Sequence, residues 1–395
     1  MRYDANRMNV IKYYGSKAMT YQTIVEQIDT ANTTMYIEPF GGGASVLLNK
    51  PPHEIEVYNE ANLGVYTLFH VLADREQGEE LKMRLRDVAY TEETFEEALQ
   101  IKNCSEGRSL QDIDRRIAMF IRQIQKKYNS HIIKDFEEAY RTIEREGKDK
   151  KAIEEQINAK GTGDEKLNAI IQNYGLTEEE LYYGEQLYQN RESMIRNQDY
   201  IEKKMENIDE IDIAKANFIA YNMSWNGMCD WFAKRDGQKS FEKKVEGLSN
   251  VMQRLQNVVV LNEDAFDLLD RERLNEKLEE KGVNIKGIYN SKIIYYLDPP
   301  YVADERIART KSEQGKNKIN PGDAYFVGKN FNHIELLEKI KDTDCMMMVS
   351  NYRDENRLYD TYLSEQNGWR TIEFETKTTI SNVNMDRTEV LWKNF

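Results

Sequence analysis

A pair of prolines follows an apolar run in the segment YYLDPPYVA, residues 295–303. The residues before the prolines are β-branched and aromatic, which is typical of a buried strand. Proline cannot continue a strand ladder, so we expect the strand to end at Asp298. Pro299 and Pro300 would then fix the backbone between a carboxylate and the ring of Tyr301. The segment is either a stiff turn that ends a strand or a rigid platform that presents an acid and an aromatic ring to a ligand.

A glycine-rich turn follows an earlier predicted strand, in YIEPFGGGAS, residues 36–45. Three consecutive glycines let the backbone turn sharply and let a ligand approach the main chain closely. The N-terminus of the helix that follows could face a polar group of a cofactor. The segment matches neither the GxGxxG dinucleotide fingerprint nor a phosphate loop. Ordinary turns between strands and helices also use glycine, so this turn alone identifies no ligand.

The next predicted strand ends in an acid, Glu60, within EVYNEAN, residues 56–62. Such an acid commonly binds ribose hydroxyls, and the competing interpretation is an acid at a helix N-terminus. It lies roughly 20 residues after the glycine turn, which is the separation found in nucleoside-binding units. Together the two features suggest an adenosyl-bearing cofactor. No phosphate-gripping residues accompany them, so a neutral or cationic nucleoside fits better than NAD or ATP.

These residues follow short apolar strands that alternate with helix-like stretches, which predicts a parallel sheet with helices on both faces. Ligands of such sheets bind outside the carboxyl ends of the strands. The end of the chain instead predicts an antiparallel hairpin at the sheet edge, from residues 369–381 and 387–395. The predicted parallel strands are 35–40, 54–60, 257–264, 292–301 and 345–351.

The net charge of −14 argues at first against a nucleic-acid partner, but its distribution changes that interpretation. Residues 76–212 carry a net charge of −10, and the rest of the chain carries −4. The acidic segment contains no proline and predicts a set of amphipathic helices. Its acidity therefore says little about the partners of the α/β portions.

The composition predicts a cytoplasmic protein that neither spans a membrane nor binds a metal. No apolar run approaches the ~18 residues that a membrane span needs, and the N-terminus has no apolar signal core. Cys104, Cys229 and Cys345 form no CxxC pair, which favours a reduced protein without a structural zinc site. The four histidines show no ligand spacing.

In order along the chain, these motifs resemble those of the Dam-like DNA adenine methyltransferases, which use S-adenosylmethionine. IKYYGSK (11–17) is similar to the family's N-terminal motif, with Tyr13 where Trp is usual. EPFGGGAS resembles its cofactor loop, EVYNEAN its ribose-binding segment and LDPPY its catalytic motif. NMSWNGM (222–228) resembles its DNA-recognition region, and TKTTIS and RTEVLWKN resemble its closing strands. The long acidic segment has no counterpart.

The resemblance implies a Rossmann-like methyltransferase sheet with an antiparallel C-terminal hairpin and a mostly helical insertion. The catalytic domain would comprise residues 1–75 and 255–395, and residues 76–254 would form the insertion and the DNA target-recognition region. For Lys17 the alternative is a solvated surface lysine, and for Asp264 a simple acid at a strand end. The implied cofactor-binding residues are Tyr13, Lys17, Glu38, Pro39, Phe40, Gly41, Gly43, Glu60, Asp264, Phe266 and Asp298.

The implied catalytic residues are Asp298, Pro299, Pro300 and Tyr301. The amino nitrogen of adenine is a poor nucleophile because its lone pair is delocalised into the ring. The Asp298 carboxylate and the Pro299 carbonyl can accept both amino hydrogens and so localise the lone pair toward the methyl donor. Tyr301 would stack on the flipped-out adenine. The sulfonium methyl is already activated, so neither a metal nor a covalent intermediate is needed and catalysis rests on positioning.

Two regions could contact double-stranded DNA. Residues 224–239 combine aromatic and basic side chains, which suits an opened duplex, although a small hydrophobic core is the alternative. The basic segment 306–322, with a net charge of +4, suits phosphate binding, although it could be an ordinary solvated loop. Asp230 stands where GATC-type members tend to carry Arg, a guanine reader, so the target sequence stays open. The candidate DNA-binding residues are Trp225, Asn226, Lys234, Arg235, Lys239, Arg306, Arg309 and Lys311.

Two other functions compete with DNA adenine methylation. The same acceptor arrangement suits amino groups of RNA or of a protein glutamine, and a non-catalytic DNA-binding module could keep the same fold. The intact sequence from Asp298 to Tyr301 argues against the non-catalytic module. We expect a monomer or a homodimer, in which the helical insertion enlarges the recognition region or binds a partner.

Overall fold

The computed structural model describes residues 7–13, 15–105, 207–229, 231–235, 237–302, 331–354, 356–380 and 383–395. The chain divides into two compact units. The first comprises Met1–Lys102 and Asp209–Phe395, and the second comprises Asn103–Ile208. The sheet and the predicted site residues that the structure describes belong to the first unit.

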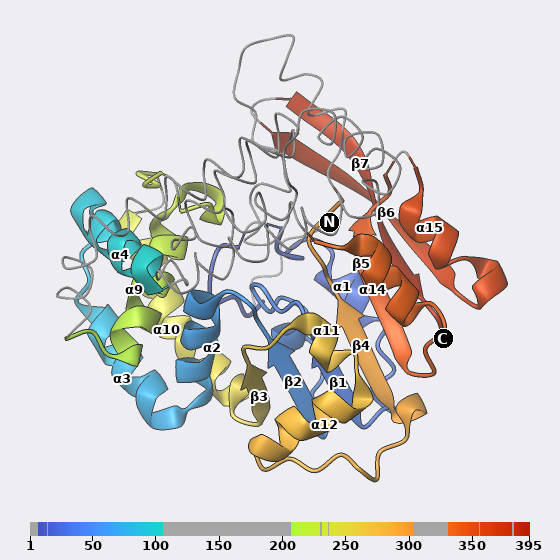
Figure 1. The fold of residues 1–395 in the computed structure, drawn as a ribbon. Helices are drawn as coiled ribbons and strands as arrows, with labels where there is room; N and C mark the ends of the chain where they lie inside the picture. Colours follow the sequence, from blue (N-terminus) through green and yellow to red (C-terminus); the bar gives the residue numbers. More distant parts are fainter. Residues whose placement is uncertain are drawn as a thin grey trace, which may run out of the picture. The chain divides into compact units, whose positions relative to one another are not determined.

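Seven strands of the described residues form one mixed sheet in the order β3-β2-β1-β4-β5-β7-β6 (Figure 1). The first five are parallel, and β7 runs antiparallel to both β5 and β6. The predicted parallel strands and the antiparallel C-terminal hairpin are therefore confirmed. The strands are β1 Met35–Glu38, β2 Ile55–Asn59, β3 Val258–Leu261, β4 Ile293–Leu297, β5 Met346–Tyr352, β6 Arg370–Ile380 and β7 Val383–Lys393.

The strand order reverses between β1 and β4. From β1 the chain proceeds outward to β2 and β3, and it then returns to place β4 on the other side of β1. Ile37 of β1 has Val57 of β2 as its partner on one side and Tyr295 of β4 on the other. Open α/β sheets bind ligands outside the carboxyl ends of their strands at such a reversal. The fold therefore directs attention to the residues that follow β1 and β4.

The strands β1, β3 and β4 are nearly continuous apolar runs, because both faces of the parallel part of the sheet are buried. Side chains alternate between the faces, so Tyr36 packs in one hydrophobic cluster while Met35 and Ile37 pack in the other. Tyr295 and Tyr296 of β4 are divided between the clusters in the same way. We call these the first cluster, which contains Tyr36, and the second cluster, which contains Ile37.

Helices cover both faces. Residues of α2, α3, α9 and α10 pack in the first cluster, and residues of α12, α14 and α15 pack in the second. The helices are α1 Tyr21–Val25, α2 Leu63–Ala73, α3 Arg75–Arg86, α4 Glu92–Ser105, α9 Glu210–Met223, α10 Gly237–Leu255, α11 Ala265–Leu268, α12 Arg271–Glu280, α14 His333–Ile340 and α15 Leu358–Tyr362. Short 3₁₀ helices are η1 Leu47–Asn49, η2 Trp225–Gly227, η3 Asn290–Lys292 and η6 Glu365–Asn367.

Several helices of the predicted 76–254 insertion belong to the unit that contains the sheet. Leu81 of α3, Phe218 of α9 and Leu248 of α10 pack in the same cluster as Tyr36. The boundaries of this compact unit thus fall at 102 and 209 and differ from the predicted 75 and 255. The helical prediction is confirmed for α3 and α4, and residues 106–206 lie outside the described part of the chain. A target-recognition role for residues 76–254 stays a prediction.

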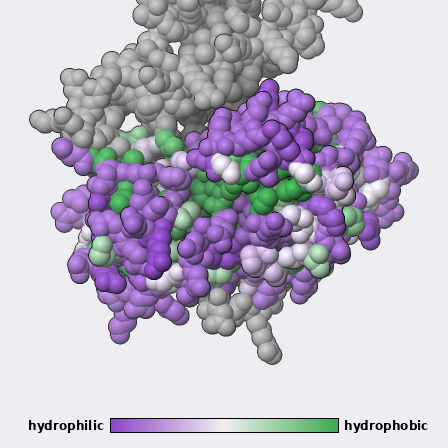
Figure 2. Space-filling model, turned by 90° about the horizontal axis from the view of Figure 1, so that it is seen from below, coloured by the Kyte–Doolittle hydropathy of each residue, from purple (hydrophilic) through white to green (hydrophobic). Residues whose placement is uncertain are grey.

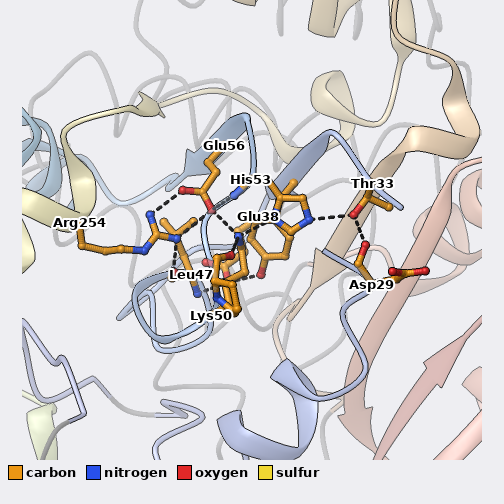
Figure 3. Close-up of polar contacts among 10 residues, drawn as sticks. Asp29, Thr33, Glu38, Leu47, Lys50, His53, Glu56 and Arg254 are labelled. Carbon is orange, nitrogen blue, oxygen red and sulfur yellow. Dashed lines mark hydrogen bonds and ion pairs between the residues drawn. The ribbon is translucent and has the colours of Figure 1, made fainter. Parts of the chain in front are cut away.

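A buried ionic network crosses the first face of the sheet (Figure 3). Arg254 of α10 donates to both carboxylate oxygens of Glu56 on β2, at 2.5 and 2.8 Å, and to the Leu47 carbonyl at 2.7 Å. The Lys50 ammonium also pairs with Glu56 and lies 2.8 Å from Nδ1 of His53. Burial lowers the pKa of Lys50 to about 8 and that of His53 to about 4. The network ties α10 and the segment after η1 to β2.

Seen from below, the surface is mostly hydrophilic, with apolar side chains gathered in a band across its middle (Figure 2). Within the described ranges, no helix combines the length and apolar character that crossing a membrane requires.

Candidate functional site

The glycine turn and the proline pair meet at the carboxyl edge of the sheet. Glu38 ends β1 and opens the turn, and Asp298 follows the last residue of β4, the strand beside it. The buried Asn59 fastens this edge, because its Nδ2 donates to the carbonyls of Pro39 at 2.9 Å and Glu263 at 3.0 Å. Its Oδ1 accepts from the Glu263 amide at 2.8 Å. One amide thus holds the ends of β1, β2 and β3 together.

Four side chains form a lysine–carboxylate cluster beside the proline pair: Lys17, Asp298, Tyr301 and Glu389. The Lys17 ammonium lies 2.6 Å from Oδ1 of Asp298 and 3.4 Å from Oε1 of Glu389, and it bonds the Tyr301 hydroxyl. The Tyr301 hydroxyl donates to Oε1 of Glu389 at 3.1 Å. Lys17 is buried, so its interpretation as a solvated surface lysine is wrong.

Burial and charge act in opposite directions in this cluster. Burial raises the pKa of Asp298 to about 6, although the neighbouring Lys17 ammonium lowers it. Burial alone would lower the pKa of Lys17, but Asp298 and Glu389 outweigh burial and raise this pKa above its usual value. At neutral pH the cluster therefore holds an ionised Asp298 beside a charged lysine.

Tyr301 is only 4% exposed, and its ring is covered in this structure. The ring of Tyr352 lies against it, with 4.3 Å between centroids, and the Lys17 ammonium lies 4.7 Å from the Tyr301 centroid. The structure thus gives Tyr301 a hydrogen-bonding position within the cluster. Stacking of Tyr301 on a base stays a prediction.

The glycine turn is shaped by two tyrosines and Glu60. A Cβ on Gly41 would lie 2.1 Å from the Tyr58 ring, and Gly42 has a φ of +48° with the Tyr13 ring 2.9 Å from where its Cβ would be. The Glu60 carboxylate accepts from the Gly42 amide at 2.7 Å and from the Asn62 amide at 2.8 Å. Packing and backbone conformation therefore require glycine here. Glu60 holds the turn, and its contact with a ribose stays a prediction.

Glu38 is a buried acid whose two carboxyl oxygens differ in their hydrogen bonding. Its Oε1 accepts from the Tyr36 hydroxyl at 2.7 Å and from the Leu47 amide at 3.0 Å. Its Oε2 has no hydrogen-bond partner within the described residues. Burial raises the pKa of Glu38 to about 8, so the carboxyl is mostly protonated at pH 7. It can donate or accept one further hydrogen bond.

Three phenylalanines gather beyond the ends of β1 and β3. Phe331 lies 5.5 Å from Phe40 and 5.8 Å from Phe266, measured between ring centroids. The exposed Asp264 caps α11, where its carboxylate accepts from the Phe266 amide at 2.8 Å. The helix cap explains Asp264 as a strand-end acid and does not test its predicted contact with a cofactor.

The tryptophan loop, residues 224–232, presents two large side chains to solvent. Its ends are joined by a bridge between Ser224 and Phe232, and the Trp225 amide donates to the Trp231 carbonyl at 2.8 Å. Phe232 packs against Tyr90, at 5.1 Å between centroids, while Trp225 is 49% and Trp231 76% exposed. The loop therefore has its own small apolar contact and still exposes both tryptophans.

The structure describes some of the residues predicted to contact DNA. Lys234, Arg235 and Lys239 are exposed, and Lys234 pairs with Glu92 at 3.2 Å. The side chain of Asn226, together with Asp230, Arg306, Arg309 and Lys311, lies outside the described residues.

The tryptophan loop packs against the segment that leads to Lys17. Gly227 has a φ of +69°, and a Cβ there would lie 2.0 Å from the Lys12 carbonyl oxygen. The Lys12 ammonium donates to the Ser224 carbonyl at 3.3 Å, and Asn222 donates to the Val10 carbonyl at 3.0 Å. The N-terminal motif thus contacts the loop through Lys12 and contributes Lys17 to the lysine–carboxylate cluster.

Sequence reasoning missed three residues of the site. Glu389 and Tyr352 lie opposite each other on β7 and β5, and Phe331 precedes α14. Glu389 stands among the apolar residues of RTEVLWKN, and a buried acid in such a strand is a usable signal because it requires a partner. Tyr352 and Phe331 offered no such signal.

No cluster of three or more His, Cys, Asp or Glu side chains that could hold a metal ion occurs in the described part of the chain. Comparison with models of protein families gave no match, and a search of the curated proteins gave none either.

Proposed function

We propose that the protein is an S-adenosylmethionine-dependent DNA adenine methyltransferase with a Rossmann-like sheet. The observation that carries the proposal is the meeting of the glycine turn after β1 with Asp298-Pro299-Pro300 after β4, at the reversal of strand order. The first segment has the character of a nucleoside site, and the second has that of an amine acceptor site. Neighbouring ends of these two strands are where a methyl donor and an amino group would have to meet.

Asp298 is suited to accept a hydrogen from an exocyclic amino group. Its pKa of about 6 leaves the carboxylate ionised at pH 7, and Pro299 supplies a carbonyl oxygen on a backbone that proline restricts. Acceptors already in position need no reorganisation as the nitrogen attacks the methyl carbon. The nitrogen gains the methyl group and loses one hydrogen as a proton, and the methyl–sulfur bond breaks.

The residues at the ends of β1, β2 and β3 fit an adenosyl group. Phe40, Phe266 and Phe331 offer apolar faces for a purine, and Asp264 is an exposed acid that could accept a hydrogen bond from the adenine. The Oε2 atom of the buried Glu38 could form a hydrogen bond with a polar group of the cofactor. When bound, S-adenosylmethionine would supply an activated methyl group. Tyr13 and Glu60, which shape the glycine turn, would hold the backbone against it.

A nucleic-acid substrate is supported by the tryptophan loop. Trp225 and Trp231 are exposed within one short loop, and the exposed Lys234, Arg235 and Lys239 follow it. Aromatic wedges next to basic side chains suit a duplex from which a base is withdrawn.

A labelled-methyl transfer assay on duplex DNA, RNA and protein, followed by identification of the methylated base, tests the proposal. We expect N6-methyladenine in DNA. Labelling of RNA or of protein glutamine would favour the amino-methyltransferase alternatives, and no transfer with intact DNA binding would favour the non-catalytic module.

Asp298→Ala should lower methyl transfer by about 100- to 1,000-fold, which is the usual loss when one preorganised polar group is removed. DNA binding, measured by fluorescence anisotropy, should stay within a few-fold of that of the unmodified protein. Retained turnover would refute the role of Asp298.

A further inference from the structure

Glu389 is a buried carboxylate at the catalytic edge that the proposed reaction has not used. It lies on β7 opposite Tyr352 of β5 and is 5% exposed. An ionised carboxylate in such a position needs a charged or hydrogen-bonding partner, because an unpaired buried charge is strongly destabilising. Its partners therefore indicate what it does.

Both partners come from distant parts of the chain. The Lys17 ammonium, 3.4 Å from Oε1 of Glu389, belongs to the N-terminal motif. The Tyr301 hydroxyl, 3.1 Å from the same oxygen, belongs to the segment after β4. One carboxylate oxygen therefore joins three segments that the fold brings to one edge of the sheet.

The arrangement places a single ammonium between two carboxylates. Lys17 lies closer to Asp298, at 2.6 Å, than to Glu389. With Glu389 present, the Lys17 ammonium pairs with both carboxylates. Without Glu389, the ammonium would pair with Asp298 alone, and the Tyr301 hydroxyl would lose an acceptor.

We propose that Glu389 is a positioning residue that holds the Lys17 ammonium and the Tyr301 hydroxyl, and so keeps the Asp298 carboxylate oriented and available as an acceptor. This role rests on the proposed methyl transfer to an amino group. Glu389 acts through Lys17 and Tyr301 and does not itself touch the substrate.

Glu389→Gln removes the charge and keeps the shape of the side chain. We expect kcat for methyl transfer to fall about 10- to 100-fold, in keeping with the cost of misplaced reacting groups, and KM for DNA to stay within about twofold. Glu373→Gln is the control, because Glu373 lies on the adjacent strand β6, pairs with Arg353, and has Val390 as its strand partner, so its side chain faces the opposite side of the sheet from that of Glu389. The control should leave kcat unchanged.

A double-mutant cycle separates positioning from general damage to the fold. Tyr301→Phe deletes only the hydroxyl that donates to Glu389, so part of the effect of Glu389→Gln should disappear in the Tyr301→Phe background. Effects that simply multiply would overturn the link through Tyr301. Should Glu389→Gln fail to fold, Tyr301→Phe alone must still lower kcat, and an unchanged kcat there would overturn the proposal.

A titration of the protein without cofactor or DNA gives a readout independent of turnover. In ¹³C-carboxyl NMR, Glu389→Gln should lower the pKa of Asp298, since a like charge is removed and Lys17 pairs more fully with Asp298. An unchanged or raised pKa would overturn the proposal. Among the described residues, the ionisable groups that act on Asp298 include Lys17, Glu38, Tyr296, Tyr301, Tyr359 and Glu389, and Tyr352 acts on Lys17.

The two proposals fail in different ways. A protein that transfers no methyl group to any amine refutes the proposed function, while the NMR titration still tests whether Glu389 controls the state of Asp298. If the protein is active and Glu389→Gln changes neither kcat nor the pKa of Asp298, only the positioning role is refuted.

Discussion

Arg254→Met tests how much the buried network around Glu56 contributes to folding. Methionine keeps the apolar stem of the side chain and removes two hydrogen bonds to the Glu56 carboxylate and one to the Leu47 carbonyl. Removing one partner of a buried ion pair typically costs about 3–5 kcal/mol. Because Lys50 still pairs with Glu56, we expect a loss near the lower end, about 3 kcal/mol of unfolding free energy.

Arg84→Met is the control, since Arg84 is also an arginine held by several side-chain contacts, here ion pairs with Glu80, Asp209 and Asp212. These pairs are solvent-accessible, with the Arg84 side chain 29% exposed against 10% for Arg254. Exposed pairs typically contribute about 0.2–1 kcal/mol and many contribute nothing measurable, so the loss for Arg84→Met should be below the loss of about 3 kcal/mol for Arg254→Met.

Urea unfolding followed by tryptophan fluorescence measures the stability of the unit that contains the sheet. All four tryptophans lie in this unit, and two of them, Trp369 and Trp392, are buried there. Equal losses for Arg254→Met and Arg84→Met, or a loss below about 1 kcal/mol for Arg254→Met, would refute the reasoning that burial makes the difference.

Two further predictions concern the site. Glu38 has a folded-state pKa of about 8, above its unfolded value, so its contribution to stability is complete below about pH 4.5 and is lost as the pH rises through about 8. Glu38→Gln should therefore gain stability relative to the unmodified protein between those pH values and level off above about pH 8 in chemical unfolding; a difference independent of pH contradicts this. Trp231→Ala should weaken DNA binding about 5- to 100-fold in anisotropy titrations, because a stacked base contributes about 1–3 kcal/mol. Tyr289→Ala, another exposed aromatic just before β4, should have no effect, and equal losses from the two changes would show that exposure alone accounts for binding.

The sheet could be predicted because its signals are local. The runs that became β1 and β4 are apolar up to their last residues, since both faces of the sheet are covered, and each is followed by a recognisable turn. The run that became β2 is apolar apart from Glu56, whose charge is paired with Arg254 and Lys50. Glu38 and Asp298 could be identified as site residues because each directly ends or follows such a run.

The missed features depend on contacts between distant segments. No local pattern pairs Glu389 with Lys17, because the two meet only when β7 inserts between β5 and β6. The boundary of the compact unit that contains the sheet also depends on contacts between distant segments. The apolar stripe of α10 predicts a helix with one buried face, but it does not say that this face packs on the sheet rather than within a separate helical domain.

The contact at Gly227 constrains how the tryptophan loop and the N-terminal motif can move relative to each other. Even one additional carbon at this position would collide with the Lys12 carbonyl, so the tryptophan loop packs closely against the N-terminal motif. A force that shifts the loop is therefore transmitted to the main chain five residues before Lys17. Under the proposed function, DNA that displaces the tryptophan loop would also displace the Lys12 main chain, and binding at the surface would then be coupled to the position of the ammonium beside Asp298.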